Sequence, residues 1–258
     1  MADTDKYMPA TITRRVDHAE DLFTIWVRSE QGLAFKPGQY VAFGLDDHAN
    51  KVLERAFSIV SCPAEEELEF YIERVPGGAL SPRLYDLSVG DSVHMRRKAK
   101  GIFALDTVSG HTRHFLICTV TGVAPYVSMI RTLLREEAAG KPFQGTIVLM
   151  QGAATSQEFA YAREIEEAAK KVSWLTYIPT ISRPWEDPEW KGERGRVDDL
   201  VRKYSDQLGL VPEETTGYLC GNPGMIVNAR GILKRRGYNE KSIKEETYWA
   251  PGEGEVEY

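Results

Sequence analysis

The chain has 258 residues, of which 42% are hydrophobic and 27% are charged, and this composition excludes a mainly disordered, collagen-like or coiled-coil protein. The 32 Lys and Arg against 38 Asp and Glu give a net charge of −6, which disfavours a role in coating nucleic acid. No run of apolar residues is long enough to span a membrane, and the charged segment 1–15 lacks the apolar core of a signal peptide.

The cysteines are few and far apart. Cys62, Cys118 and Cys220 form no CxxC pair, no zinc-site spacing and no disulfide framework. Three thiolates also cannot ligate a four-thiolate iron–sulfur cluster. We therefore expect a reduced, cytoplasmic protein without a metal site.

The first part of the sequence is typical of β-structure. Short runs rich in β-formers are separated by turn residues such as Pro37-Gly38 and Pro76-Gly77-Gly78. The predicted strands cover 22–27, 39–43, 56–60, 68–72 and 91–95. Closely spaced short strands predict an N-terminal antiparallel β-barrel or sandwich.

The pattern changes after about residue 110 to continuous apolar runs that alternate with helical segments. The predicted strands are 114–120, 146–150, 174–181 and 218–220, and the predicted helices are 124–138, 157–171, 195–204 and one after Asn222 that ends before Gly237. Alternating strands and helices predict a doubly wound parallel sheet. We therefore predict a β-barrel domain over 1–108, followed by an α/β domain over 109–258.

Two strand ends in the α/β part can receive a ligand. Segments 119–125 and 220–223 each join a strand to a helix through small residues, and a helix N-terminus favours an anion. Neither contains the GxGxxG dinucleotide fingerprint, and each alone also fits an ordinary strand-to-helix turn. Ser182-Arg183, with Arg194 and Arg196 further on, would suit a phosphate, although arginines in a solvated loop would look the same.

One strand of the barrel part carries a cation and a ring on the same face. Arg55 and Phe57 are two residues apart in a predicted strand, so both side chains point the same way. Such a face could hold a phosphate-bearing aromatic ligand. An arginine paired with Glu54 or another acid at a strand end explains the segment equally well.

Taken together, these segments resemble the bacterial type of ferredoxin (flavodoxin)–NADP⁺ reductase. Arg55-Ala56-Phe57-Ser58 is similar to the family's Arg-x-Tyr-Ser flavin motif. The other matches follow in family order, namely 68–71, 78–84, 121–126, Ser182-Arg183, 195–197, 220–225 and the aromatic pair Tyr248-Trp249. The resemblance covers nearly the whole chain, and it implies FAD on the barrel and NADP(H) on the α/β domain.

The resemblance also implies roles in FAD binding. Arg55 would pair with the pyrophosphate, Phe57 would stack on the isoalloxazine, and Ser58 would lie near flavin N5 and assist hydride transfer. The backbone and hydroxyl donors to the pyrophosphate would come from Ala79, Leu80 and Ser81. The remaining FAD contacts would come from Ala56, Tyr71, Ile72, Glu73, Arg74, Tyr248 and Trp249.

On the nucleotide side, the resemblance places Thr121 where nicotinamide and flavin meet and Cys220 near the nicotinamide. Ser182, Arg183 and Arg196 would bind the 2′-phosphate, with Arg194 as an additional cation. Such an enzyme passes a hydride between NADPH and FAD and single electrons between FAD and an acidic ferredoxin or flavodoxin. The basic run 94–100 could dock that carrier, or it could be a solvated strand end. We expect a monomer with no nucleic-acid or membrane partner.

The sequence departs from the family pattern at a few positions. Phe57 replaces a tyrosine, Val120 replaces a glycine, and Ala154 stands where many relatives have an arginine for the 2′-phosphate. The acidic tail 250–258 follows Trp249. Two alternatives stay open. One is the reductase component of an oxygenase system, which would also use a separate ferredoxin, and the other, because of Val120 and Ala154, is a flavin-bearing electron-transfer subunit with weakened pyridine-nucleotide binding.

Overall fold

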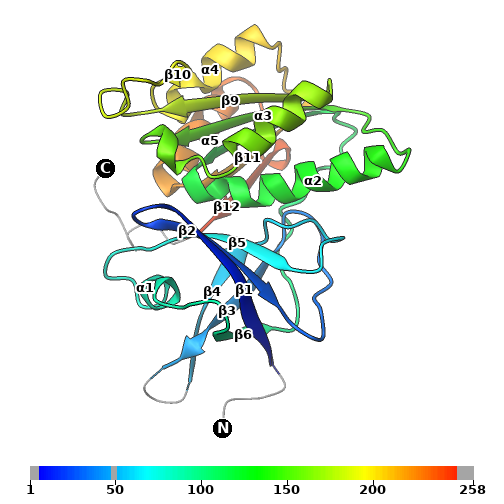
Figure 1. Cartoon of the computed structure of the whole chain (residues 1–258). Coiled ribbons are helices and arrows are strands. Elements are labelled where there is room, and N and C mark those ends of the chain that lie inside the picture. The colour runs from blue at the N-terminus through cyan, green and yellow to red at the C-terminus, as the bar shows by residue number, and fades with distance from the viewer. Residues whose placement is uncertain (1–5, 48–50, 249–258) are drawn as a thin grey trace. The chain divides into compact units, whose positions relative to one another are not determined.

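The computed structural model of the chain describes residues 6–47 and 51–248 and divides into two compact units (Figure 1). Unit 1 comprises the described residues up to Ala104 together with Ala124–Leu134. Unit 2 comprises Leu105–Val123 and the described residues from Arg135 onward. The first division of the chain thus falls between Ala104 and Leu105.

Unit 1 is built on a six-stranded sheet in the order β4-β3-β6-β1-β2-β5, in which all the strand pairs are antiparallel. The strands are β1 (Tyr7–Ala19), β2 (Leu22–Arg28), β3 (Tyr40–Asp46), β4 (Val52–Ser58), β5 (Leu68–Glu73) and β6 (Ser92–Arg96). The amide of Val60, just after β4, donates to the carbonyl of Glu69 in β5 at 2.9 Å. This bond joins the two edge strands, so the predicted antiparallel barrel is confirmed.

Strand β1 is absent from the sequence-based prediction although it lies in the middle of the sheet. Its polar residues, among them Arg14, Arg15 and Asp17, hide the alternation that places Met8 and Ile12 in the core. The side chains of these two residues pack with Phe23, Ile25, Phe43 and Phe70 inside the barrel.

Unit 2 contains a parallel sheet in the order β10-β9-β8-β7-β11-β12. Its strands are β7 (Arg113–Thr119), β8 (Thr146–Ala153), β9 (Leu175–Ile181), β10 (Glu193–Arg194), β11 (Thr215–Gly221) and β12 (Ile243–Thr247). The chain proceeds outward from β7 to β10 and then returns to the other side of β7 with β11. This reversal confirms the doubly wound sheet and places its topological switch point between β7 and β11.

The helices are α1 (Ser81–Tyr85), α2 (Ala124–Ala138), α3 (Ala162–Lys171), α4 (Val197–Gln207) and α5 (Pro223–Arg235). Short 3₁₀ turns cover Val120–Val123, Ser156–Glu158 and Glu240–Ser242. Figure 1 shows α3 on the near face of the parallel sheet, and α4 and α5 bury Val201 and Leu233 against Phe115 and Val148 on its other face.

Several predicted element boundaries are corrected. The helix predicted over 157–171 begins at Ala162, and the one predicted from 195 begins at Val197, because Gly195 has φ +120° and Arg196 is extended. Strands β10 and β12 were not predicted. The predicted N-cap of α5 is confirmed, since the side chain of Asn222 accepts a hydrogen bond from the Met225 amide at 3.1 Å.

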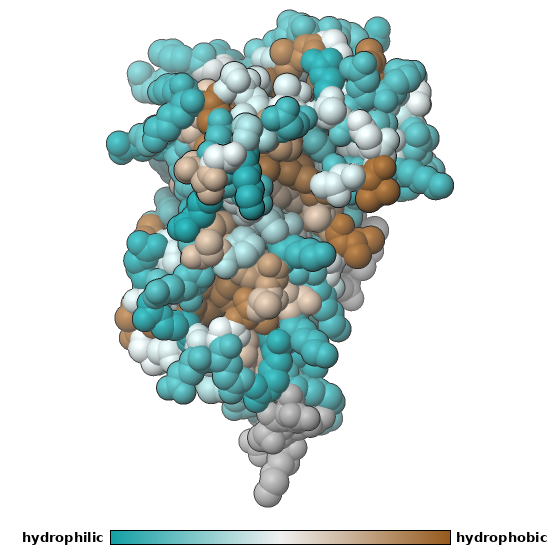
Figure 2. Space-filling view, turned by 90° about the vertical axis from the view of Figure 1, so that its right-hand side faces the viewer, coloured by the Kyte–Doolittle hydropathy of each residue, from teal (hydrophilic) through white to brown (hydrophobic). Residues whose placement is uncertain are grey.

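The described surface is largely polar. On the face drawn in Figure 2, hydrophobic residues form patches among hydrophilic ones. None of the helices within the described ranges combines the length and apolarity needed to cross a bilayer.

Candidate functional site

The predicted flavin motif lies on an edge of the barrel sheet. Strand β4 pairs with β3 on one side only, so residues along its other side are available to a ligand. Arg55 and Ala56 are exposed. The Arg55 guanidinium donates to the carbonyl of Glu54 at 2.9 Å, and it forms no ion pair with the residues that the structure describes. An exposed cation on an open strand edge fits a phosphate group.

The other half of the motif is more buried. The ring of Phe57 is half-buried and packs on the core residue Phe43, with the ring centroids 4.4 Å apart. The part of the ring that stays accessible fits a flat partner. Ser58, the last residue of β4, is buried, with 5% of its surface exposed. Main-chain pairing of Val60 with Glu69 then brings this strand end beside β5.

Strand β5 carries the second group of predicted flavin residues. The side chain of Tyr71 is directed away from the core formed by Phe70 and Ile72, because neighbouring residues of a strand alternate between its faces. Ile72 is part of that core, so only its backbone can contact a ligand. Arg74, just past the strand, donates from Nε to Asp21 Oδ1 at 2.7 Å, and this bond raises the pKa of Arg74.

The predicted pyrophosphate donors lie before helix α1. Ala79 is exposed, whereas the side chain of Leu80 belongs to the barrel core, which leaves its backbone alone for a ligand. The hydroxyl oxygen of Ser81 accepts from the Val75 amide at 3.0 Å. That bond holds the loop in place and leaves the hydroxyl proton for another acceptor.

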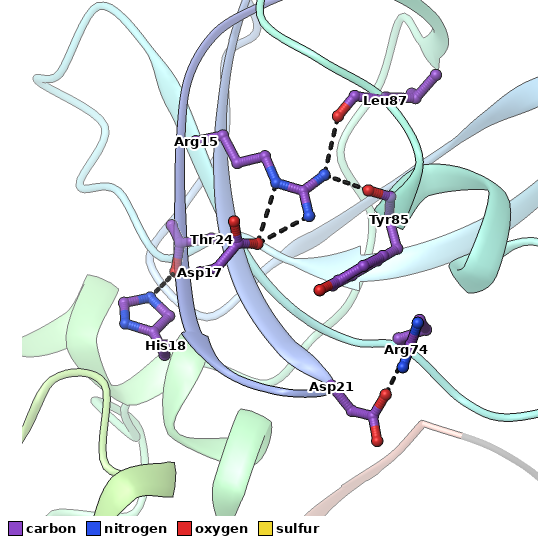
Figure 3. Close-up of polar contacts among 8 residues, drawn as sticks. All are labelled: Arg15, Asp17, His18, Asp21, Thr24, Arg74, Tyr85 and Leu87. Carbon is purple, nitrogen blue, oxygen red and sulfur yellow. Dashed lines mark hydrogen bonds and ion pairs between the residues drawn. The ribbon is translucent and has the colours of Figure 1, made fainter.

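Sequence reasoning missed the polar cluster that supports this edge, which Figure 3 shows around Tyr85. Arg15 donates to the backbone oxygens of Tyr85 and Leu87, the latter at 2.8 Å, and pairs with Asp17 at 2.7 Å. The guanidinium carbons of Arg15 and Arg74 lie 4.6 and 4.5 Å from the centre of the Tyr85 ring. The sequence contains no local signal for this cluster, because β1 was not predicted and the partners of Arg15 in and just after α1 lie about 70 residues away.

His18 lies at the end of β1 and contacts one of the predicted flavin residues. Its Nε2 lies 2.8 Å from the hydroxyl of Thr24, and its ring meets Tyr71 edge-on with a centroid separation of 5.5 Å (Figure 3). Burial lowers the pKa of His18, and Asp17 and Glu69 partly oppose that effect. The neutral imidazole therefore supports Tyr71 as a packed ring.

At the switch point of unit 2, the two glycines of the predicted turns allow close backbone contact. A Cβ atom on Gly122 would lie 2.4 Å from the carbonyl oxygen of Cys220. Gly221 has φ +117°, and a Cβ there would lie 2.5 Å from Oγ1 of Thr119. The same Oγ1 accepts from the Asn222 amide at 2.9 Å. Larger residues cannot occupy either glycine position without moving backbone.

Val120, the first residue of the 3₁₀ turn that follows β7, adopts φ +40°, and it is the only non-glycine residue with positive φ in the described part of the chain. A β-branched residue is strained in this region and persists only where its surroundings impose it. Gln151, fully buried in β8, donates from Nε2 to the Val120 carbonyl at 3.4 Å and accepts from the Tyr177 hydroxyl at 2.7 Å. The Val120 side chain packs against the cluster formed by Ala153, Phe159 and Ile181.

Three predicted residues meet at this switch point. The hydroxyl of Tyr248 donates to the carbonyl of Thr121 at 3.3 Å and also hydrogen-bonds to Cys220. Burial raises the pKa of the Cys220 thiol well above its usual value, so the group stays protonated. Cys220 pairs in register with Cys118 of β7, whose pKa is also raised by burial. Trp249, the other predicted aromatic residue, lies outside the described residues.

The predicted phosphate-binding residues share one edge of the parallel sheet. Ser182 donates from its amide to the Ala153 carbonyl at 2.9 Å, and the Arg183 amide donates to Ala154 at 2.9 Å. Strand β10 pairs Arg194 with Ile181, the residue before Ser182. This pairing brings Arg183 and Arg194 to the carboxyl end of β9, where doubly wound sheets bind ligands.

Each of these arginines already has a neighbour. Arg183 lies 3.6 Å from Glu186, Arg196 lies 3.4 Å from Asp198, and Arg194 donates to the Trp190 carbonyl at 3.2 Å. Ala154 offers no cation, and Glu158 accepts from its amide at 3.0 Å. Burial raises the pKa of Glu158. The edge therefore has three guanidinium groups, and the carboxyl groups of Glu186, Asp198 and Glu158 lie near it.

The basic run 94–100 is less available than its sequence indicates. Arg96 forms a bidentate ion pair with Glu54, with nitrogen–oxygen distances of 2.7 and 2.6 Å, and this pair lowers the pKa of Glu54. His94 lies 3.1 Å from Asp46. Lys98 and Lys100 remain exposed. Within the described residues, no group of His, Cys, Asp and Glu could hold a metal ion.

Two families of known protein domains match this chain, one in its N-terminal part and one in its C-terminal part. Residues 10–101 match the oxidoreductase FAD-binding domain, and residues 116–231 match the oxidoreductase NAD-binding domain. A flavodoxin/ferredoxin–NADP reductase from Rhodobacter capsulatus is 31% identical over 91% of this chain and 88% of its own. A ferredoxin–NADP reductase from Pseudomonas aeruginosa is 32% identical over 84% of this chain and 86% of its own.

Among solved structures, a ferredoxin NADP⁺ reductase from Neisseria gonorrhoeae with bound FAD and NADP has the same fold. It is 21% identical, with a TM-score of 0.83 over 95% of this chain and 99% of that one. The family assignment rests on the sequence identity to the Rhodobacter and Pseudomonas reductases, which extends over most of each chain. The chain belongs to the ferredoxin (flavodoxin)–NADP⁺ reductase family.

Proposed function

We propose that the protein transfers a hydride between NADPH and FAD, and single electrons between FAD and a ferredoxin or flavodoxin. The observation that carries this proposal is the packing of the two turns at the switch point. A side chain at Gly122 would clash with Cys220, and one at Gly221 would clash with Thr119. Both glycines thus let the turns pack closely on the protein's own backbone at the carboxyl edge of the sheet, where doubly wound folds bind dinucleotides. The exposed Arg55 on the edge strand β4 supports the part of the proposal that concerns flavin binding.

FAD, when bound, supplies the redox chemistry, because a flavin exchanges electrons both as a hydride and one at a time. The chain's own residues bind and orient it. Arg55 would neutralise the pyrophosphate, Phe57 would offer its accessible ring to the isoalloxazine, and Ser58 would donate a hydrogen bond from the end of β4. Tyr71, Glu73 and Arg74 would hold the ribityl and adenosine side, with Ala79 and Ser81 as further donors.

On unit 2, Thr121, Cys220 and Tyr248 would line the nicotinamide end, where the hydrogen bonds of Tyr248 join the other two. Because the Cys220 thiol stays protonated, we assign it a packing contact with the nicotinamide rather than proton transfer. Ser182, Arg183, Arg194 and Arg196 would bind the 2′-phosphate. We assign the FAD-binding role to residues 1–108 and the NADP(H)-binding role to 109–258.

The first test is an anaerobic titration of the purified protein with NADPH, followed by visible absorption. Flavin bands that bleach in proportion to added NADPH are the expected result. Bands that yield to dithionite but resist NADPH would instead favour an electron-transfer subunit that has lost its pyridine-nucleotide donor. Omitting the ferredoxin or flavodoxin acceptor keeps this reductive half-reaction separate from the choice of partner.

The choice between NADPH and NADH is tested by the double variant Arg183→Ala, Arg196→Ala. It should raise KM for NADPH far more than KM for NADH, because NADH lacks the phosphate that these cations neutralise. Arg202→Ala is a matched control, since Arg202 is an exposed arginine of the same helix region, paired only loosely with Asp206 at 3.8 Å. Equal effects on both coenzymes would remove the two arginines from the 2′-phosphate site.

The acceptor is tested by steady-state reduction of a purified ferredoxin and a purified flavodoxin. Exposed cations such as Lys98 and Lys100 should steer an acidic carrier, so the rate should fall as ionic strength rises. Lys98→Glu combined with Lys100→Glu should lower this rate, while ferricyanide reduction by NADPH stays unchanged. An unchanged rate with either carrier would place its docking surface elsewhere.

A further inference from the structure

A few large hydrophobic side chains are exposed in the described part of the chain. Trp185 is the aromatic one among them, with 72% of its surface accessible. An exposed tryptophan contributes little to folding stability, although its apolar area is the largest of all side chains. Exposed tryptophans accordingly recur in binding sites. Trp185 lies in the loop between β9 and β10.

This loop is held in place by several bonds. The Ser156 amide donates to Asp187 Oδ2 at 3.0 Å, and the Trp190 amide donates to the Asp187 carbonyl at 3.2 Å. The indole of Trp190 donates to the Glu193 carbonyl at 2.7 Å and packs on Phe159 with a centroid separation of 5.6 Å. The loop thus uses Trp190 as its anchor and leaves Trp185 exposed.

Trp185 and Arg183 belong to the same tight turn. The Glu186 amide donates to the Arg183 carbonyl at 3.0 Å, which closes a turn over residues 183–186. The Arg183 amide in turn donates to Ala154, so this turn is tied to the end of β8. Trp185 and Arg183 therefore come from one turn that is attached to the carboxyl edge of the sheet.

We propose that Trp185 is the stacking platform for the adenine ring of NADP(H), and that the indole supplies affinity that the missing arginine at Ala154 does not. The inference rests on the proposed function, because it identifies a further positioning residue for the same coenzyme. NADP(H) carries its 2′-phosphate on the ribose attached to the adenine, so an aromatic ring and a cation from one turn suit the adenine and the phosphate, respectively. A tryptophan in a fixed loop loses little side-chain freedom when a base stacks on it.

The adenine half is isolated by two probes. 2′-Phospho-AMP contains the adenine and the phosphate without nicotinamide, and reduced nicotinamide mononucleotide contains the hydride donor without adenine. Binding of 2′-phospho-AMP to the FAD-loaded protein is measured by isothermal titration calorimetry. Flavin reduction by NADPH and by reduced nicotinamide mononucleotide is measured by stopped-flow absorption.

For Trp185→Ala we expect the Kd of 2′-phospho-AMP to rise about tenfold, within the range that base–aromatic stacking commonly contributes. KM for NADPH should rise by a similar factor, whereas the limiting rate of flavin reduction at saturation and the rate with reduced nicotinamide mononucleotide stay unchanged. Trp185→Phe should retain most of the affinity. Val227→Ala, which truncates another exposed apolar side chain (65% accessible) on α5, should change none of these quantities.

An unchanged Kd of 2′-phospho-AMP in Trp185→Ala would overturn the proposal. If that variant instead lost only the rate of ferredoxin or flavodoxin reduction, the exposed indole would belong to a protein interface, which also overturns it. Failure of the proposed function would look different, because NADPH would then not bleach the flavin of the unaltered protein.

Discussion

Arg15 binds Tyr85 twice, once at the backbone and once at the ring. Its guanidinium donates to the Tyr85 carbonyl and lies 4.6 Å from the centre of the ring. Tyr85 is the last residue of α1, and that helix begins directly after the residues proposed to bind the FAD pyrophosphate. The contact therefore attaches the far end of α1 to β1, and it fixes where the first residues of the helix lie.

We predict that Arg15→Ala weakens FAD retention, although Arg15 is not among the residues proposed to contact FAD. The change leaves the carbonyls of Tyr85 and Leu87 without their charged donor, which typically costs about 1–3 kcal/mol of folding free energy. Arg14→Ala is the matched control, since Arg14 lies 3.5 Å over the Trp26 ring and has no contact with α1 among the described residues. The measurements are the FAD content after dialysis and the urea midpoint. Equal flavin loss in both variants would contradict a specific role for Arg15.

Val120 permits a test of backbone strain with a matched pair of variants. Val120→Ala and Val120→Gly both remove the packing against Ala153 and Ile181, but only glycine adopts φ +40° without strain. We expect the glycine variant to be more stable than the alanine variant by about 1 kcal/mol, the reverse of the usual order. Urea unfolding of both measures this. Greater stability of the alanine variant would contradict the strained conformation.

Gly122 should not tolerate a side chain. In Gly122→Ala the new Cβ would meet the Cys220 carbonyl oxygen at 2.4 Å and its carbon at 2.7 Å, both of them backbone atoms that cannot rotate away. We expect a loss of about 1–3 kcal/mol, typical of overpacking, and slower flavin reduction by NADPH. Gly231→Ala is the control, because its Cβ would meet only the flexible end of Arg235 at 3.3 Å and alanine favours a helix. Equal stability of the two variants would refute the close approach.

The regular elements of unit 2 were predictable because buried parallel strands appear as continuous apolar runs, as at 114–120 and 146–150. Strand β1 was not, since it contains the polar residues Arg14, Arg15 and Asp17, and the two arginines contact Trp26, Tyr85 and Leu87, which lie further along the sequence. The same reason applies to the site. Motifs such as Arg55-Ala56-Phe57-Ser58 are local, whereas the contact of Gly122 with Cys220 and the bond from Gln151 to Val120 depend on which strands become neighbours.

A buried histidine in unit 2 should make folding stability depend on pH. His114 is 3% exposed, and its Nδ1 lies 2.9 Å from the hydroxyl of Tyr218. That hydroxyl accepts from the Asp106 amide at 2.8 Å, so its own proton is available to the imidazole. Burial is the main cause that lowers the pKa of His114 to about 4, with Asp106 opposing it and Lys244 and His111 adding to it.

Because the folded pKa of His114 lies below the unfolded value of about 6.5, the unfolded state binds more protons between these limits. Stability should therefore be unaffected by this group above pH 6.5, and it should fall as the pH drops from about 6.5 to about 4, by on the order of 3 kcal/mol at most. Asp106, whose pKa is lowered to about 2 mainly by backbone hydrogen bonds that outweigh its burial, adds a loss in a separate range below about pH 4.

The measurement is urea unfolding at pH 7.0, 6.0, 5.0 and 4.5 for the unaltered protein and for His114→Gln. Glutamine can still accept a hydrogen bond from Tyr218 but does not titrate, so we expect the variant to be the less stable protein at pH 7 and to lose less stability on acidification. His111→Gln is the control, since His111 is half-exposed and contacts Thr216 at 3.0 Å instead. The same pH slope in His114→Gln as in the unaltered protein would show that the acid sensitivity arises elsewhere.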